Sequence, residues 1–229
     1  MSKPCASTSL PGEFVLASAS ASRFKLLENA GIEFFQYPVS IDEEAIRASG
    51  IAESVPVKDI AVMLAEMKAA VAVQRLETEN LAPPFYVLGC DQILVCDGTI
   101  YSKPKDIVTA KSQLLALSGK THQLFTAVVL FQHGKRIWHN LSVADLTMRQ
   151  FDDEFIDFYL EQLGESAFDS PASYQIESIG VQLFAKIKGC HYGILGIPLL
   201  ELLAILREHS LSPFDRTSRD KSKDKNRYC

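Results

Sequence analysis

The sequence predicts a single α/β domain, because short apolar segments typical of strands alternate with longer segments typical of amphipathic helices. A buried strand at 13–17 runs through small residues into a helix at 23–30, and residues 57–77 have the pattern of a long helix. Residues 122–132 and 136–149 are two long alternating segments. With 229 residues and 47% hydrophobic content, the chain is long enough to bury a substantial core.

The first unit is a strand, a loop of small residues at 18–22 and a helix that Gly31 ends. Ser22 is the expected N-cap. A strand that opens into a helix through such a loop is a recurring phosphate site, since free N–H groups and the helix dipole favour an anion. Arg23 adds a positive charge, although a serine-rich loop also serves simply as a cap.

The next two predicted strands each lead to acidic residues. Residues 32–39 are expected to form a second strand that runs into acidic residues 42–44, and the helix at 57–77 carries an apolar stripe. A strand at 85–90 then meets Asp91, which we expect at the strand end, where a carboxylate is well placed for chemistry.

The second half is predicted to be a hairpin, a helix, a long antiparallel pair and two more helices. Residues 93–96 precede the turn Asp97-Gly98, and a helix near 108–117 ends before Gly119. The alternating segments flank the turn at 133–135. The last helices start at the expected N-cap Asp152 and at Pro198, and they end at Gly164 and about Glu208.

Composition excludes several classes of protein. No apolar run reaches the roughly 20 residues of a membrane span, and no secretory signal is recognisable, so we expect a cytoplasmic protein without a membrane partner. Five cysteines without C-x-x-C spacing argue against a disulfide framework or a zinc site. The net charge is −5, and residues 209–229 form a basic tail that we expect to be disordered, like residues 1–12. The acidic body argues against a nucleic-acid partner.

Four further groups carry charges suited to phosphate chemistry. They are the pair Asp42-Glu43, then Lys68 on the long helix, Asp91, and Lys103 in a loop. Each has an ordinary structural alternative: a helix cap, a solvated helix face, a turn residue or a loop lysine. Their combination and order favour a joint role.

These groups recur as motifs in a fixed order along the chain. The order is Ser18-Ala19-Ser20-Ala21-Ser22-Arg23, Asp42-Glu43, Leu64-Ala65-Glu66-Met67-Lys68-Ala69, Gly89-Cys90-Asp91-Gln92, Lys103-Pro104, Leu117-Ser118-Gly119-Lys120-Thr121-His122, Tyr174-Gln175-Ile176-Glu177-Ser178-Ile179-Gly180 and Gly196-Ile197-Pro198-Leu199. Over roughly residues 13–208 this order resembles the Maf family of nucleotide pyrophosphatases. In two places the chain departs from the family pattern, since Ala21-Ser22 replaces Pro-Arg and Ser102 replaces a glycine.

The resemblance implies an inosine-triphosphatase-like fold, an elongated mixed sheet flanked by helices with a nucleotide held between two lobes, often as a homodimer. It also implies water attack on the α-phosphorus of a nucleoside triphosphate. Glu43, with Asp42, would hold Mg²⁺ or Mn²⁺, and Asp91 would be the general base. The phosphate charge would be neutralised by Arg23, Lys68 and Lys103. The phosphate loop would be lined by Ser18 and Ser20.

Base selectivity in the family follows three positions, here Ser22, Gln92 and Glu177. Gln92 and Glu177 resemble the subgroup that acts on 7-methyl-GTP, which suggests removal of modified nucleotides, whereas Ser22 matches neither subgroup. A carboxylate such as Glu177 accepts hydrogen bonds from a guanine edge and favours a cationic base. Two alternatives stay open: a dTTP or UTP pyrophosphatase, and a nucleotide-binding regulator of cell division without turnover.

Overall fold

Strands precede helices at the start of the chain, and the two longest strands follow one another near its middle. The computed structural model describes residues 14–79 and 86–212. Its strands are β1 (Phe14–Leu16), β2 (Phe35–Gln36), β3 (Tyr86–Cys96), β4 (Thr99–Tyr101), β5 (Thr121–Gln132), β6 (Lys135–Met148) and β7 (Phe184–Lys188). The α-helices are α1 (Ala21–Asn29), α2 (Glu43–Ala52), α3 (Val57–Thr78), α4 (Ile107–Leu117), α5 (Asp153–Leu163), α6 (His191–Ile194) and α7 (Leu199–Glu208). Three 3₁₀ turns, η1 (Gly164–Phe168), η2 (Pro171–Ser173) and η3 (Ile179–Leu183), complete the described part.

The strands form one open sheet, which confirms the predicted mixed α/β class. The order is β2-β1-β3-β5-β6-β7, with β4 paired to the far end of β3. β1 lies parallel to β2 and β3, and all other pairs are antiparallel. The predicted long pair is β5 and β6, joined by the turn at His133 and Gly134, both of which have positive φ.

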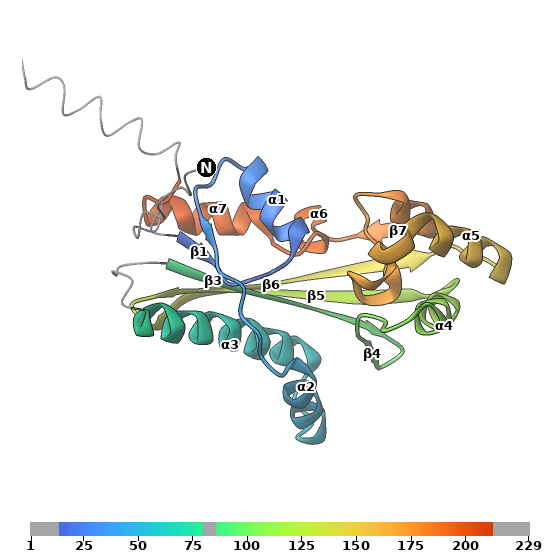
Figure 1. Ribbon diagram of the computed structural model, residues 1–229, viewed down its shortest axis with the longest axis horizontal. Coiled ribbons are helices and arrows are strands. Elements are labelled where there is room, and N and C mark those ends of the chain that lie inside the picture. The colour runs from blue at the N-terminus through green and yellow to red at the C-terminus, as the bar shows by residue number, and fades with distance from the viewer. Residues whose placement is uncertain (1–13, 80–85, 213–229) are drawn as a thin grey trace, which may run out of the picture.

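Helices cover both faces of one half of the sheet and cluster around its other half (Figure 1). α3 packs below β1, β3 and β5, while α1 and α7 lie above the same strands and bury the opposite side chains. A separate core lies at the far ends of β3, β5 and β6, where these strands pack with α4 and α5. We call it the distal core, and this half of the molecule the distal lobe. The long strands therefore run through two lobes, and the middle of each strand lies where the lobes meet.

Several expected boundaries are confirmed and several are corrected. Asp152 caps α5, and the Asp97-Gly98 turn joins β3 to β4. The cap of α1 is Ser20 and not Ser22, because the Ser20 hydroxyl accepts from the Arg23 amide and the helix begins at Ala21. The predicted strand at 32–39 is reduced to Phe35–Gln36, since β1 offers it only a short edge to pair with.

The largest correction concerns Asp91. Residues 86–96 form one strand, so Asp91 lies in the interior of β3 and not at a strand end. A polar residue within an apolar run suggested an end, but β5 continues to pair with β3 as far as Val95. The structural alternative for Asp42, a helix cap, is what the structure has, since Asp42 caps α2. The bounds of that helix were not predicted, because Ile46 and Ile51 are its only large apolar residues.

Some predictions fall outside the described residues, namely those on the flexible segment 1–12, on Cys5 and Cys229 and on most of the basic tail. Cys90, Cys96 and Cys190 are free thiols, and burial raises the pKa of Cys90 to about 11, as befits a structural thiol. Among residues 14–79 and 86–212, none of the helices combines the length and the apolar character that crossing a bilayer requires.

The distal core makes stability depend on pH through His122. His122 is fully buried with Nε2 2.8 Å from the hydroxyl of Tyr174, and burial lowers its pKa from 6.5 to about 4. The unfolded chain therefore binds the proton at a higher pH than the folded chain, and stability is lost as pH falls from about 6.5 towards 4. Urea unfolding at pH 7 and pH 5 should show His122 contributing about 2 kcal/mol of that loss.

The check is His122→Gln, which keeps a hydrogen-bonding group for Tyr174 but does not titrate. We expect the free energy of unfolding of this variant to change less between pH 7 and pH 5 than that of the wild type. Equal changes in the two proteins would show that the loss comes from other groups.

Candidate functional site

The centre of β3 is paired on one side only. β1 pairs with β3 up to Leu88, and β4 pairs with it from Leu94 onwards, so residues 89–93 have β5 as their one strand partner in the described structure. Asp91 and Gln92 lie in this gap, at the junction of the two lobes. A gap in a sheet leaves room for a ligand to approach the backbone and the side chains of both faces.

Close packing at Gly89 brings α3 against this part of β3. A Cβ atom built on Gly89 would lie 2.0 Å from the carbonyl oxygen of Ala65 and 3.0 Å from the Cβ atom of Ala69, so only glycine fits. Side chains two apart on a strand share a face, and Asp91 therefore faces α3 as the glycine does. The helix is held near enough for Lys68 to reach Asp91.

Three charged side chains from three elements meet there. The Nζ atom of Lys68 lies 2.6 Å from Oδ1 of Asp91 and 2.6 Å from Oε1 of Glu43. The side chain of Lys68 is 11% exposed and that of Asp91 is 5% exposed. Asp91 and Glu43 thus lie close together, and the ammonium group of Lys68 lies between the two carboxylates.

The surroundings shift the two carboxylates in opposite directions. Burial raises the pKa of Asp91 above its ordinary value, and the opposing effect of Lys68 only partly offsets this. Burial also acts to raise the pKa of Glu43, but Lys68 and Arg47 outweigh it and lower that pKa. Burial thus favours proton uptake by Asp91, while Lys68 and Arg47 favour the charged form of Glu43, a division that suits a base beside a carboxylate.

The first turn of α1 adds a fixed positive charge, that of Arg23. Arg23 donates from Nη1 to Ser18 Oγ (3.1 Å) and to the carbonyl oxygen of Cys90 (3.2 Å), and from Nε to the carbonyl oxygen of Gly196 (3.1 Å). Its Nη2 has no hydrogen-bond partner among the described residues. Arg23 is therefore held next to Asp91 by the predicted loop residue Ser18, while Ser20 caps the helix that carries it.

The three predicted selectivity residues lie on the other side of the gap. Gln92 follows Asp91 and so points to the opposite face of β3, where its amide donates to Thr126 Oγ1 (2.7 Å) and to the carbonyl oxygens of Gly193 and Ile194. Ser22 donates to Oε1 of Glu177 at 2.7 Å, across 155 positions of sequence. Acid–base residues and selectivity residues are thus separated by one strand.

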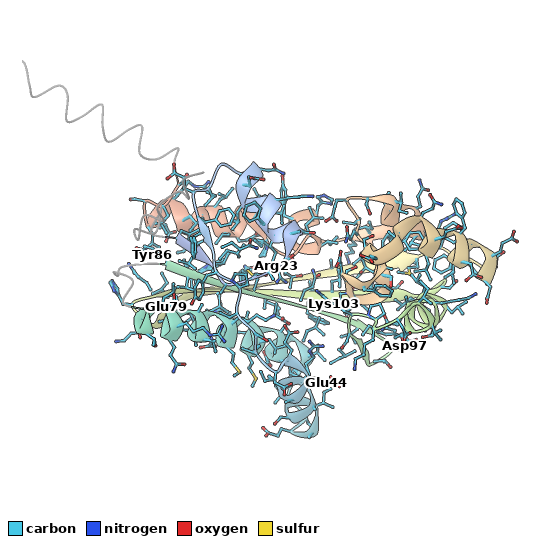
Figure 2. The ribbon with its side chains drawn as sticks, viewed as in Figure 1. Arg23, Glu44, Glu79, Tyr86, Asp97 and Lys103 are labelled. Carbon is cyan, nitrogen blue, oxygen red and sulfur yellow. The ribbon has the colours of Figure 1, made fainter. Side chains whose placement is uncertain are left out.

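Lys103 and Asp42 complete the predicted set. Lys103 is exposed in the loop after β4 and makes no hydrogen bond or ion pair within the described part of the chain. In Figure 2, Lys103 and Arg23 both lie near the middle of the long axis of the molecule. Asp42 caps α2, since its Oδ1 accepts from the amide of Ala45 at 3.0 Å.

Two residues that contact the predicted site residues are not indicated by the sequence patterns. Arg47 pairs with Glu43 one helical turn away, and Thr126 is a buried partner of Gln92. The spacing of Glu43 and Arg47 would have indicated the pair had the helix been predicted. An apolar pocket of about 490 Å³ between α4 and α5 contains none of the site residues.

The carboxylates have the chemistry of a site for a hard divalent cation. Oδ2 of Asp91 is buried and has no hydrogen-bond partner in the described structure, and Glu43 presents its oxygens from the facing helix. No group of three potential protein ligands occurs within residues 14–79 and 86–212. The arrangement fits an ion such as Mg²⁺, which binds one or two carboxylates and takes its other ligands from phosphate and water.

A mixed sheet with a carboxylate–lysine–carboxylate cluster beside a fixed arginine defines an α/β protein suited to binding an anion together with a metal ion. Residues 13–209 match the family described as Maf-like protein, and the chain belongs to that family. Two curated relatives have names that state an enzymatic activity. A nucleoside triphosphate pyrophosphatase of Paramagnetospirillum magneticum is 44% identical over 195 residues, which cover 85% of this chain and 97% of that protein. A 7-methyl-GTP pyrophosphatase of Brucella suis is 45% identical, with 85% and 95% covered.

Proposed function

We propose that this protein is a cytoplasmic nucleoside triphosphate pyrophosphatase that hydrolyses 7-methyl-GTP to the monophosphate and pyrophosphate. The observation that carries the proposal is the ammonium group of Lys68 between Glu43 and Asp91, beside Arg23 and the gap in the sheet. The names of the relatives support the reaction, and two of the three selectivity positions support the substrate.

In the proposed reaction, the carboxylate of Asp91 accepts a proton from water as the water oxygen bonds to the α-phosphorus. The bond from that phosphorus to the bridging oxygen breaks, and pyrophosphate leaves with the electron pair. Lys68, Arg23 and Lys103 stabilise the negative charge that spreads over the phosphate oxygens.

The family relationship implies a divalent cation, and the chemistry of Glu43 and Asp91 fits one. Mg²⁺ or Mn²⁺ would polarise the attacking water and offset phosphate charge. Glu43 would be its main protein ligand, and any contribution of Asp42 would use the carboxylate oxygen that does not cap α2. A homodimer stays a prediction.

Ser22 has a specific role in this proposal. The family uses an arginine there, whereas Ser22 donates a hydrogen bond to Glu177. The bond orients the carboxylate of Glu177 and leaves its second oxygen to accept from the guanine edge, while its negative charge favours the cationic methylated base.

The test measures pyrophosphate release from 7-methyl-GTP, GTP, dTTP and UTP, with Mg²⁺, Mn²⁺ or EDTA. We expect metal-dependent release with the highest kcat/KM for 7-methyl-GTP. Glu177→Gln should lower the ratio of kcat/KM for 7-methyl-GTP to kcat/KM for GTP by about tenfold, because it removes the negative charge facing the base. Glu165→Gln, an exposed acid elsewhere in the distal lobe, is the matched control.

Each alternative function has its own outcome in this assay. Faster turnover of dTTP or UTP than of 7-methyl-GTP would favour the other subgroup. Binding of nucleotide without release of pyrophosphate from any substrate would favour the regulator of cell division.

A further inference from the structure

Arg47 is a largely buried charged residue that the proposed chemistry does not use. It lies on α2, and its side chain is 18% exposed. Nη2 pairs with Oε2 of Glu43, Nη1 donates to Oγ of Ser102 at 2.9 Å, and Nε is buried without a partner in the described structure. Removing a guanidinium group from water to this degree costs free energy, which these two contacts offset.

Ser102 belongs to the other lobe and immediately precedes Lys103. Its carbonyl oxygen accepts from Nε2 of Gln113 on α4 at 3.0 Å. Oε1 of Gln113 in turn accepts from the amide of Ala172 at 3.1 Å, in the turn that leads to the segment of Glu177. The lysine loop is therefore held from the distal lobe through its backbone and from α2 through the hydroxyl of Ser102.

These contacts form a continuous path across the junction of the lobes. Asp91, Lys68, Glu43, Arg47 and Ser102 are joined in that order by hydrogen bonds or ion pairs. Lys103, which has no polar contact of its own among the described residues, is placed by the backbone of its neighbour Ser102.

We propose that Arg47 is a positioning residue that fixes the Lys103 loop relative to Glu43 and so places the Lys103 charge over the phosphate chain. Its effect on kinetics rests on the proposed function. The planar guanidinium group can hold Glu43 and Ser102 at once, whereas a lysine ammonium has no such fork. Arg47 itself contacts no reacting atom and acts through Lys103 and Glu43.

Ser102→Ala separates this role from the support that Arg47 gives to Glu43. The variant removes the hydroxyl contact and leaves the Arg47–Glu43 pair in place. We expect kcat to fall about fivefold to tenfold with a smaller change in KM, because the Lys103 charge matters most in the transition state. Arg47→Lys should lower kcat by at least as much, and the double variant Arg47→Lys/Ser102→Ala should be no slower than Arg47→Lys alone.

Controls make the same chemical changes where no such path exists. Ser49→Ala removes the hydroxyl of an exposed serine on α2, and Arg136→Lys changes an exposed arginine that pairs with Glu66. Both should turn over substrate like the wild type. In a Lys103→Ala background, Ser102→Ala should have no further effect, and an undiminished effect there would overturn the proposal.

A second measurement does not depend on turnover. Hydrogen–deuterium exchange of the amides in residues 102–106 should become faster in Arg47→Ala than in the wild type, while exchange in the core of α4 stays the same. Unchanged exchange at 102–106 would overturn the proposal. A wild-type protein that releases no pyrophosphate would remove the proposed function, and the exchange data would still decide whether Arg47 holds the loop.

Discussion

Asp91→Asn is expected to lower kcat for metal-dependent pyrophosphate release by about 100-fold or more, the range that loss of a general base produces. Asparagine keeps the shape of the side chain and can still accept a hydrogen bond from Lys68, but it cannot take a proton from water. The loss should therefore be seen in kcat, with little change in the free energy of unfolding.

The control is Asp97→Asn in the turn between β3 and β4. Asp97 is exposed, pairs with Lys120 and has φ of 49°, a conformation that asparagine adopts readily. This variant should release pyrophosphate at the wild-type rate. Comparable activity of Asp91→Asn and the wild type would mean that another group accepts the proton, and the acid–base assignment would be wrong.

Gly89→Ala is expected to destabilise the fold by about 3 kcal/mol, because the added methyl group would lie 2.0 Å from the carbonyl oxygen of Ala65. Backbone has to move to relieve that overlap, and the part that moves is α3, which carries Lys68. The folded fraction of the variant should also be less active, since Lys68 would shift relative to Asp91. Urea unfolding and pyrophosphate release measure the two effects.

Gly98→Ala separates this close packing from backbone strain. Gly98 has φ of 77°, and a Cβ atom there meets nothing within 4 Å, so alanine should cost only about 1 kcal/mol through its conformation. Activity should be retained. If both variants lost the same free energy of unfolding, contact between α3 and β3 would not be what makes glycine necessary at position 89.

Local patterns predicted most helices and the long hairpin correctly. These patterns depend on interactions between residues close together in the sequence. The structure has the elements indicated by the periodicity of residues 57–77, the cap at Asp152 and the Asp97-Gly98 turn. The same local patterns wrongly predict that Asp91 lies at a strand end, because nothing near it in sequence reveals that β5 continues to pair with β3.

The sequence by itself determined the family, the order of the charged motifs and the helix that carries Lys68. Only the tertiary structure decided that β1 ends opposite Leu88, which opens the gap in the sheet. It also decided that Asp91 and Gln92 point to opposite faces of β3, and that Arg47 contacts Ser102. The physical reason is that capping and helical periodicity are short-range interactions, whereas the site consists of contacts between residues far apart in the chain, such as Ser22 and Glu177. Such contacts depend on how the sheet pairs and how closely α3 packs against it.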